Sequence, residues 1–158
     1  MSARQDRAAP ARRVLATSVA PVTASAPASL ARKLGVRSGQ RVALLGAPAG
    51  WDVDGLPHGV VVVRRRSARP ADVVVAFIRR LAELERQVDT LGGTIVPDGS
   101  LWLAWPRRAG GHHSNITDTA LRTVLLPTGL VDVKVAALDE DWSGLKFVWR
   151  LEHRAAKR

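Results

Sequence analysis

The sequence predicts an α/β fold in which a mostly parallel sheet of about six strands is covered on both faces. Several short apolar runs lack the alternation of apolar and polar residues that a half-exposed strand shows, so each is expected to be a strand buried on both sides. Two later segments carry apolar side chains three or four residues apart, which is typical of amphipathic helices. Strands that alternate with helices favour a parallel sheet with right-handed crossovers.

Composition excludes several other classes of protein. The 158 residues suit a single domain, and a hydrophobic content of 46% excludes wholesale disorder. No apolar run approaches the ~18 residues of a membrane span. The absence of cysteine excludes a disulfide scaffold, a thiol nucleophile and a Cys-ligated metal site.

The first half of the domain is expected to contain one short helix and three buried strands. Ser29 can cap the helix and Gly35 can end it. The strands are predicted over residues 41–45, 60–63 and 72–77. Proline and glycine recur through residues 46–59, so the first crossovers are expected to be short and non-helical.

The second half is expected to alternate helices and strands. A helix is predicted from residue 78 to the pair Gly92-Gly93, a turn at residues 97–99, and a second helix after its N-cap Thr117. Strands are predicted over residues 100–105, 130–137 and 145–151. The loop between the last two is short enough for an antiparallel hairpin. The sheet is therefore Rossmann-like with a final antiparallel hairpin strand, and its second half resembles class I methyltransferase folds.

The formal net charge of +10 is concentrated at the amino end. Residues 1–41 carry eight basic residues against the single acid Asp6. A disordered basic tail is expected over residues 1–28, the Rossmann-like domain over residues 29–151, and a basic carboxyl-terminal tail over residues 152–158. We interpret both tails as solvated segments that keep the protein soluble. The alternative is that their basic side chains associate nonspecifically with nucleic acid.

A cytoplasmic location is expected. Proline and serine interrupt every candidate for the apolar core of a secretory signal. The amino end resembles a transit peptide in being rich in Arg and Ser, but Arg outnumbers Lys 20 to 4 across the whole chain, which indicates a general bias in composition.

The usual features of a nucleotide site are missing. A dinucleotide or adenosyl cofactor requires a glycine-rich turn after the first strand, a helix facing the ligand, and an acid at the end of the second strand. Here the turn is Gly46-Ala47-Pro48-Ala49-Gly50-Trp51, and the second strand is followed by Arg64-Arg65-Arg66, not by an acid. Arginine at that place can hold a cofactor 2′-phosphate, but the missing glycines and helix disfavour it. An ordinary SAM or NAD site is therefore not expected, and the cofactor is unknown.

The carboxyl ends of the strands are expected to meet in a rim rich in arginine and tryptophan, at the edge where open α/β sheets bind ligands. The candidate binding residues are Trp51, Arg64, Arg79, Arg80, Trp105, Arg107, Arg108, Asp139, Trp142 and Ser143. Arginine can hold an anion and tryptophan can stack on a planar group, so the expected partner is an anionic small molecule. In the competing interpretation, the charges pair with each other and the tryptophans plug the ends of the sheet.

Other catalytic and metal patterns are weak. The adjacent pair His112-His113 lacks a third ligand at a usable spacing, and the acids at residues 139–141 are typical of a solvated hairpin turn. Ser143 has no evident base. No catalytic residue and no metal is therefore assigned, and no membrane partner is expected.

Several stretches of the chain resemble a small bacterial family catalogued as domain of unknown function 3052. They are Leu101–Arg107, Thr117-Asp118, Leu126–Val135 and Asp139–Lys146, with an opening over Lys33–Val42. The resemblance covers residues 29–151 and implies a single cytoplasmic domain, but it implies no activity, substrate or catalytic residue. Its motifs at residues 105–107 and 142–144 fall on the predicted rim.

These observations favour a noncatalytic or ligand-binding Rossmann-like domain. A divergent SAM-dependent methyltransferase or another nucleotide-using enzyme is the first alternative. Nonspecific nucleic-acid association through the basic tails is the second.

Overall fold

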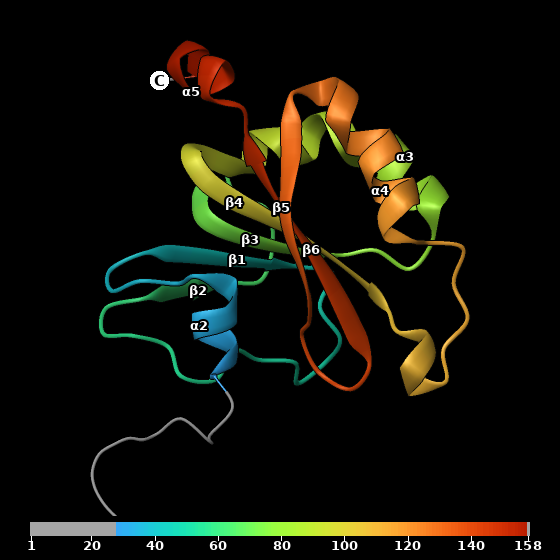
Figure 1. Cartoon of the computed structure of the whole chain (residues 1–158). Helices are drawn as coiled ribbons and strands as arrows, with labels where there is room; N and C mark the ends of the chain where they lie inside the picture. The colour runs from blue at the N-terminus through green and yellow to red at the C-terminus, as the bar shows by residue number, and fades with distance from the viewer. Residues whose placement is uncertain (1–27, 158) are drawn as a thin grey trace, which may run out of the picture.

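A six-stranded mixed sheet forms the centre of the computed structural model, which describes residues 28–157 (Figure 1). Its strands are β1 Arg41–Leu45, β2 Val61–Val63, β3 Ala71–Phe77, β4 Ile95–Pro106, β5 Leu130–Ala137 and β6 Trp142–Trp149. Their spatial order is β2-β1-β3-β4-β6-β5. The first four strands pair in parallel, and β6 runs antiparallel to both β4 and β5. The predicted α/β fold with an antiparallel hairpin strand is confirmed.

Helices cover both faces of the sheet. They are α2 Leu30–Leu34, α3 Leu81–Leu91, α4 Asp118–Leu125 and α5 Leu151–Lys157. In Figure 1, α2 lies on one side of the sheet and α3 and α4 lie on the other. Side chains of β1 alternate between the two layers, because Val42 and Leu44 belong to the core under α2 while Ala43 and Leu45 belong to the core under α3 and α4. This two-sided burial explains the unbroken apolar runs in the sequence.

The predicted helix caps are present. The Ser29 hydroxyl accepts a hydrogen bond from the Arg32 amide at 3.3 Å, and Gly35 closes α2 in the left-handed conformation with φ 81°. The Thr117 hydroxyl accepts from the Ala120 amide at 3.1 Å, with Asp118 in the first turn of α4. Both helices therefore begin where the capping residues indicate.

The first crossovers are non-helical, as predicted, but β2 is not buried. It ends the sheet, so it has one strand neighbour, and Val61 is 52% exposed. The chain between β1 and β2 covers the α2 side of the sheet with irregular backbone that packs through Trp51, Val53 and Leu56. The prediction of a buried strand was wrong because four valines in a row do not distinguish a central strand from an edge strand.

The predicted turn at residues 97–99 is wrong, because this segment lies within β4. Ala71 pairs with Ile95 and Val73 pairs with Ser100, so the longer β4 segment bulges against β3. A Cβ on Gly99 would lie 2.7 Å from the Asp72 carbonyl oxygen. The turn residues thus permit a bulge and a close backbone approach inside a strand.

The carboxyl end also differs from the prediction. The last strand covers Trp142–Trp149, so the hairpin loop consists of residues 138–141 and Trp142, Ser143 and Gly144 lie in β6. Residues 151–157, expected as the end of the strand and a basic tail, form α5. The amino-terminal tail predicted over residues 1–28 lies, except for residue 28, outside the described residues.

Within residues 28–157, we find no helix with the length and apolar character that crossing a bilayer requires.

Candidate functional site

Two of the predicted rim tryptophans meet around Phe77 at the carboxyl edge of the sheet. The Trp51 ring, from the loop after β1, packs edge-on against Phe77 with centroids 4.7 Å apart. Trp142, at the start of β6, packs edge-on at 4.9 Å. We call these three rings the aromatic cluster. Each such pair stabilises the fold by about 0.5–1.5 kcal/mol beyond the burial of its rings. The aromatic cluster therefore fills the α2 side of this edge with stably packed side chains.

Asp139 ties the aromatic cluster together. Its Oδ2 accepts a hydrogen bond from the Trp51 indole nitrogen at 2.8 Å. Its Oδ1 accepts from the backbone amides of Asp141 and Trp142, both at 2.8 Å. One carboxylate therefore fixes the hairpin loop and joins it to the loop after β1.

Three of the predicted rim arginines bond to backbone carbonyls of neighbouring loops. Arg79 donates both terminal nitrogens to the Gly46 oxygen at 3.2 Å, and its guanidinium lies 5.3 Å from the centroid of the Trp142 ring. Arg107 donates to the Asp139 oxygen at 2.9 Å. Arg64 donates to the Trp51 oxygen at 2.8 Å and lies 3.4 Å from the Asp52 carboxylate. These contacts hold the rim together.

The other four predicted rim residues do not join this network. Trp105 and Ser143 pair across β4 and β6 and line an open pocket near the start of α4. Trp105 packs against the core under α3 and α4, which is the opposite face from the aromatic cluster. Arg80 and Arg108 are exposed at the start of α3 and in the loop after β4. The structure thus divides the predicted rim between two faces of the sheet.

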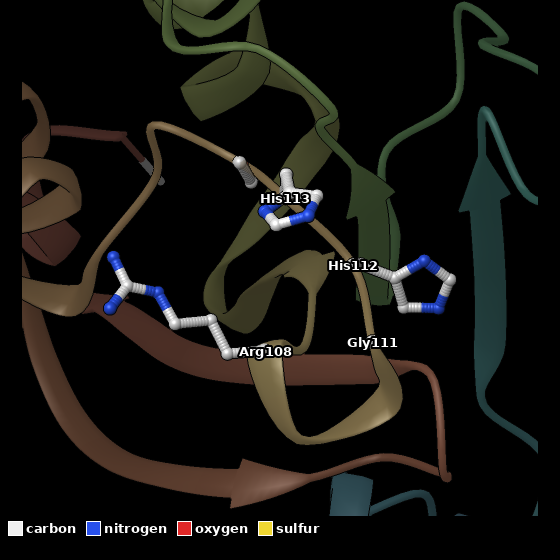
Figure 2. Close-up of a pocket in the computed structure, with 5 residues that line it drawn as sticks. Arg108, Gly111, His112 and His113 are labelled. Carbon is white, nitrogen blue, oxygen red and sulfur yellow. The ribbon is translucent and has the colours of Figure 1, made fainter.

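The loop after β4 forms an open pocket of about 520 Å³. Arg108, Gly111, His112, His113 and Ser114 line it. Figure 2 shows Arg108 and His112 pointing in opposite directions from the loop, so the side chains do not converge on one point. The His112 Nε2 lies 2.9 Å from the Asp141 Oδ1, which anchors the loop to the hairpin. Within residues 28–157, neither this pocket nor any other place holds three or more His, Cys, Asp or Glu side chains that could bind a metal ion together.

A different pocket lies where the direction of strand addition reverses. From β1 the chain adds β2 on one side and then returns to add β3 on the other, and in open α/β sheets such a switch point is where ligands bind. This switch-point pocket has a volume of about 250 Å³. It is lined by Leu45, Gly46, Arg64, Arg65, Arg66, Ala76, Phe77, Ile78 and Gln87.

The switch-point pocket combines an apolar floor with three cations and no lining carboxylate. Leu45, Ala76 and Ile78 form the floor. Arg66 donates to the Gln87 and Thr90 side chains at 2.6 and 2.8 Å, so α3 holds it in place. Arg65 has no hydrogen-bond or ion-pair partner among the described residues, which leaves its five donors available.

Comparison with known proteins finds similar solved structures but no similar sequence family. No family model matches the chain, and no curated protein matches it. The tRNA methyltransferase TrmK of B. subtilis superposes over 80% of this chain and 65% of its own, with 13% identity and a TM-score of 0.50. The described domain has a Rossmann-like, methyltransferase-type fold.

Two archaeal fibrillarins are further matches. Aeropyrum pernix fibrillarin, solved with natively bound S-adenosyl-L-methionine, covers 75% of this chain and 73% of its own at 15% identity and a TM-score of 0.47. The Methanococcus jannaschii fibrillarin, a pre-rRNA processing protein, covers 76% and 73% at 12% identity and a TM-score of 0.48.

Sequence reasoning missed several residues at this edge. Phe77 is the central ring of the aromatic cluster, and its position at the end of a predicted strand was the available signal. The contact between His112 and Asp141 was not predicted, because their loops are 29 residues apart. Arg65 was named as part of a basic run, but nothing in the sequence separates it from its tethered neighbours Arg64 and Arg66.

Proposed function

We propose that this domain binds a small phosphorylated organic anion in the switch-point pocket. The observation that carries the proposal is the position of the untethered Arg65, beside Arg64 and Arg66, over the carboxyl ends of β1 and β3. Guanidinium groups match phosphate oxygens in planar, charge-assisted pairs, and the apolar floor suits the carbon body of such a ligand.

The size of the pocket limits the ligand. At about 250 Å³ it lies below the ~300–1,000 Å³ typical of pockets for drug-sized molecules. The aromatic cluster fills the α2 side of the same edge, so the space cannot extend there without moving Trp51. The ligand is therefore a small organic phosphate or the phosphorylated end of a larger molecule.

A divergent SAM-dependent methyltransferase is the second candidate, and the fold is its support. Against it, β2 is followed by arginine where an acid would hold the ribose, and the chain after β1 forms no helix. Membership in the family of domain of unknown function 3052 also stays a prediction, based on the motifs at residues 105–107 and 142–144.

A thermal-shift titration of the full chain tests the anion site. The probes are inorganic phosphate, AMP and S-adenosyl-L-methionine, which carries no phosphate. At a hundredfold excess over Kd, a ligand adds about 2.7 kcal/mol to the free energy of unfolding, so we expect AMP to raise Tm by several degrees. Arg65→Gln should weaken AMP binding about tenfold, since one charge-assisted hydrogen bond is worth about 1.5–3 kcal/mol.

Arg86→Gln is the matched control, because Arg86 is exposed on α3 outside the pocket and its loss removes the same charge. If Arg65→Gln and Arg86→Gln weakened AMP binding equally, the loss would be due to the change in net charge, and the proposal would be overturned. Stabilisation by S-adenosyl-L-methionine without any response to AMP or phosphate would also overturn it and favour the methyltransferase.

A further inference from the structure

Four cations gather on the α2 side of the hairpin β5–β6, across the sheet from the floor of the switch-point pocket. They are Lys33 of α2, Arg37 just after α2, Lys134 of β5 and Lys146 of β6, and we call them the lysine face. Lys134 and Lys146 are direct partners across the two antiparallel strands, which places their Cβ atoms about 4.5–5.5 Å apart. The Lys146 Nζ lies 3.5 Å from where a Cβ on Gly35 would stand, so it reaches the end of α2.

No carboxylate in the described part of the chain forms an ion pair with any of the four. Lys33 donates to the Ala137 carbonyl at 3.2 Å, and the Lys134 Nζ lies 5.8 Å from the centroid of the Trp102 ring. Partial burial of Lys146 lowers the pKa of its ammonium, and the charges of Lys134 and Arg37 lower it further. Like charges directly opposite each other destabilise an antiparallel pair, so the fold retains an unfavourable arrangement here.

Three of the last four carbonyls of α2 accept hydrogen bonds from groups other than Lys146. Cations can stabilise the end of a helix by bonding to its last carbonyls. Here the Ala31 oxygen accepts from the Val36 amide, the Arg32 oxygen from the Gly35 amide, and the Leu34 oxygen from the Trp102 indole nitrogen at 3.2 Å. These carbonyls are already satisfied without the ammonium of Lys146.

We propose that the lysine face binds the phosphates of a nucleic-acid strand. Four cations on one surface can contact more than one phosphate, and a polyanion that neutralises them releases its condensed counterions. Residues 1–27, which precede α2 in the sequence, add four more cations, Arg4, Arg7, Arg12 and Arg13. A small anion would neutralise fewer of these charges.

An anionic lipid surface is the less favoured partner. Peripheral membrane binding combines basic side chains with apolar groups that enter the bilayer. Val135 of β5 is 57% exposed and pairs with Leu145 of the opposite core. The exposed Val135 therefore lies on the other face of the sheet from Lys134, whereas Ala136, on the α2 side, packs against the core.

Fluorescence anisotropy with a labelled 20-nucleotide single-stranded RNA and the full chain tests the proposal over 50–200 mM salt. The plot of log K against log[salt] loses about 0.7 in slope for each phosphate contact removed. We expect the double variant Lys134→Gln/Lys146→Gln to lower the slope by about 1.4 and to weaken binding on the order of tenfold. Arg86→Gln/Lys157→Gln is the control, since it removes two charges on α3 and α5 away from this face.

A second variant carries glutamine in place of Arg4, Arg7, Arg12 and Arg13. If Lys134→Gln/Lys146→Gln binds RNA with the native slope while the tail variant loses binding, the tail alone is responsible and the proposal is overturned. Equal losses in the lysine double variant and its control would also overturn it. Binding to vesicles containing phosphatidylserine, with no binding to RNA, would assign the face to membranes instead. Circular dichroism of each variant verifies that it folds.

Discussion

Asp139 is exposed, yet its carboxylate accepts three hydrogen bonds that join two loops. We expect Asp139→Ala to lower the free energy of unfolding by about 1–2 kcal/mol, because each lost bond is worth about 0.5–1.5 kcal/mol and water replaces part of it at an exposed site. Urea denaturation followed by tryptophan fluorescence measures this loss, and the release of Trp51 should also change its emission.

Glu140→Ala is the control for this prediction. Glu140 is the adjacent acid in the same hairpin loop and carries the same charge, and it is the Glu140 backbone carbonyl, not its side chain, that accepts a hydrogen bond from Arg107. A loss in Glu140→Ala as large as that in Asp139→Ala would show that loop charge, and not the three hydrogen bonds, stabilises the edge.

At this scale the sequence predicted which residue types meet at the edge, but not their partners. That Trp51 and Asp139 would lie at the same edge followed from strand direction. Their hydrogen bond joins residues 88 positions apart and depends on the path of two irregular loops, which no periodicity describes. The division of the rim was hidden for another reason. Strand β6 begins at Trp142, earlier than predicted, and pairs Trp105 with Ser143, so that Trp105 and Trp142 lie on opposite faces of the sheet.

Among the elements, those with two-sided burial or capping residues were predictable. The strands under helices, the caps Ser29 and Thr117, and the hairpin all follow from local sequence. Helix α5 was not predictable, because part of its support is tertiary: the His153 Nδ1 lies 3.4 Å from the carbonyl oxygen of Gly129, which precedes β5. A short basic segment gives no sign of such contacts.

The hairpin β5–β6 carries a pH-dependent cost at Lys146. Its pKa in the folded state lies below the ordinary lysine value of 10.5. The unfolded chain therefore binds more protons between the two values, and the free energy of unfolding should rise as pH rises through that window. Below the window the charged, half-buried ammonium destabilises the fold.

Lys146→Gln should remove this cost. We expect the variant to exceed the native chain in stability by about 0.5 kcal/mol at pH 7, the scale of a cross-strand pair, with the difference shrinking toward pH 10.5. Urea midpoints at pH 7, 9 and 10.5 measure the trend. Lys157→Gln, which removes the cation over Trp149, should show no such gain, and an equal gain in both variants would attribute it to the net charge of +10.

Over the whole molecule, the sheet separates two cationic surfaces of different character. The switch-point pocket is small, has an apolar floor, and lies on the side of α3. The lysine face is open and lies on the side of α2, and four arginines precede it in the sequence within residues 1–27. Composition predicted that the chain is basic and that most of the excess precedes β1, but only the fold shows on which side of the sheet each remaining cation lies.

This separation predicts that the two binding activities respond to different substitutions. Arg65→Gln should weaken AMP binding about tenfold and leave the affinity for RNA within about twofold, because one of many exposed charges contributes little to a screened, multi-contact interaction. Lys134→Gln/Lys146→Gln should do the reverse, since both lysines lie across the sheet from the pocket. Anisotropy with RNA and thermal shift with AMP, measured on both variants in the same buffer, test the two effects together. If both variants weakened both ligands in proportion to the charge removed, the chain would present one continuous cationic field, and neither the pocket nor the lysine face would be a separate site.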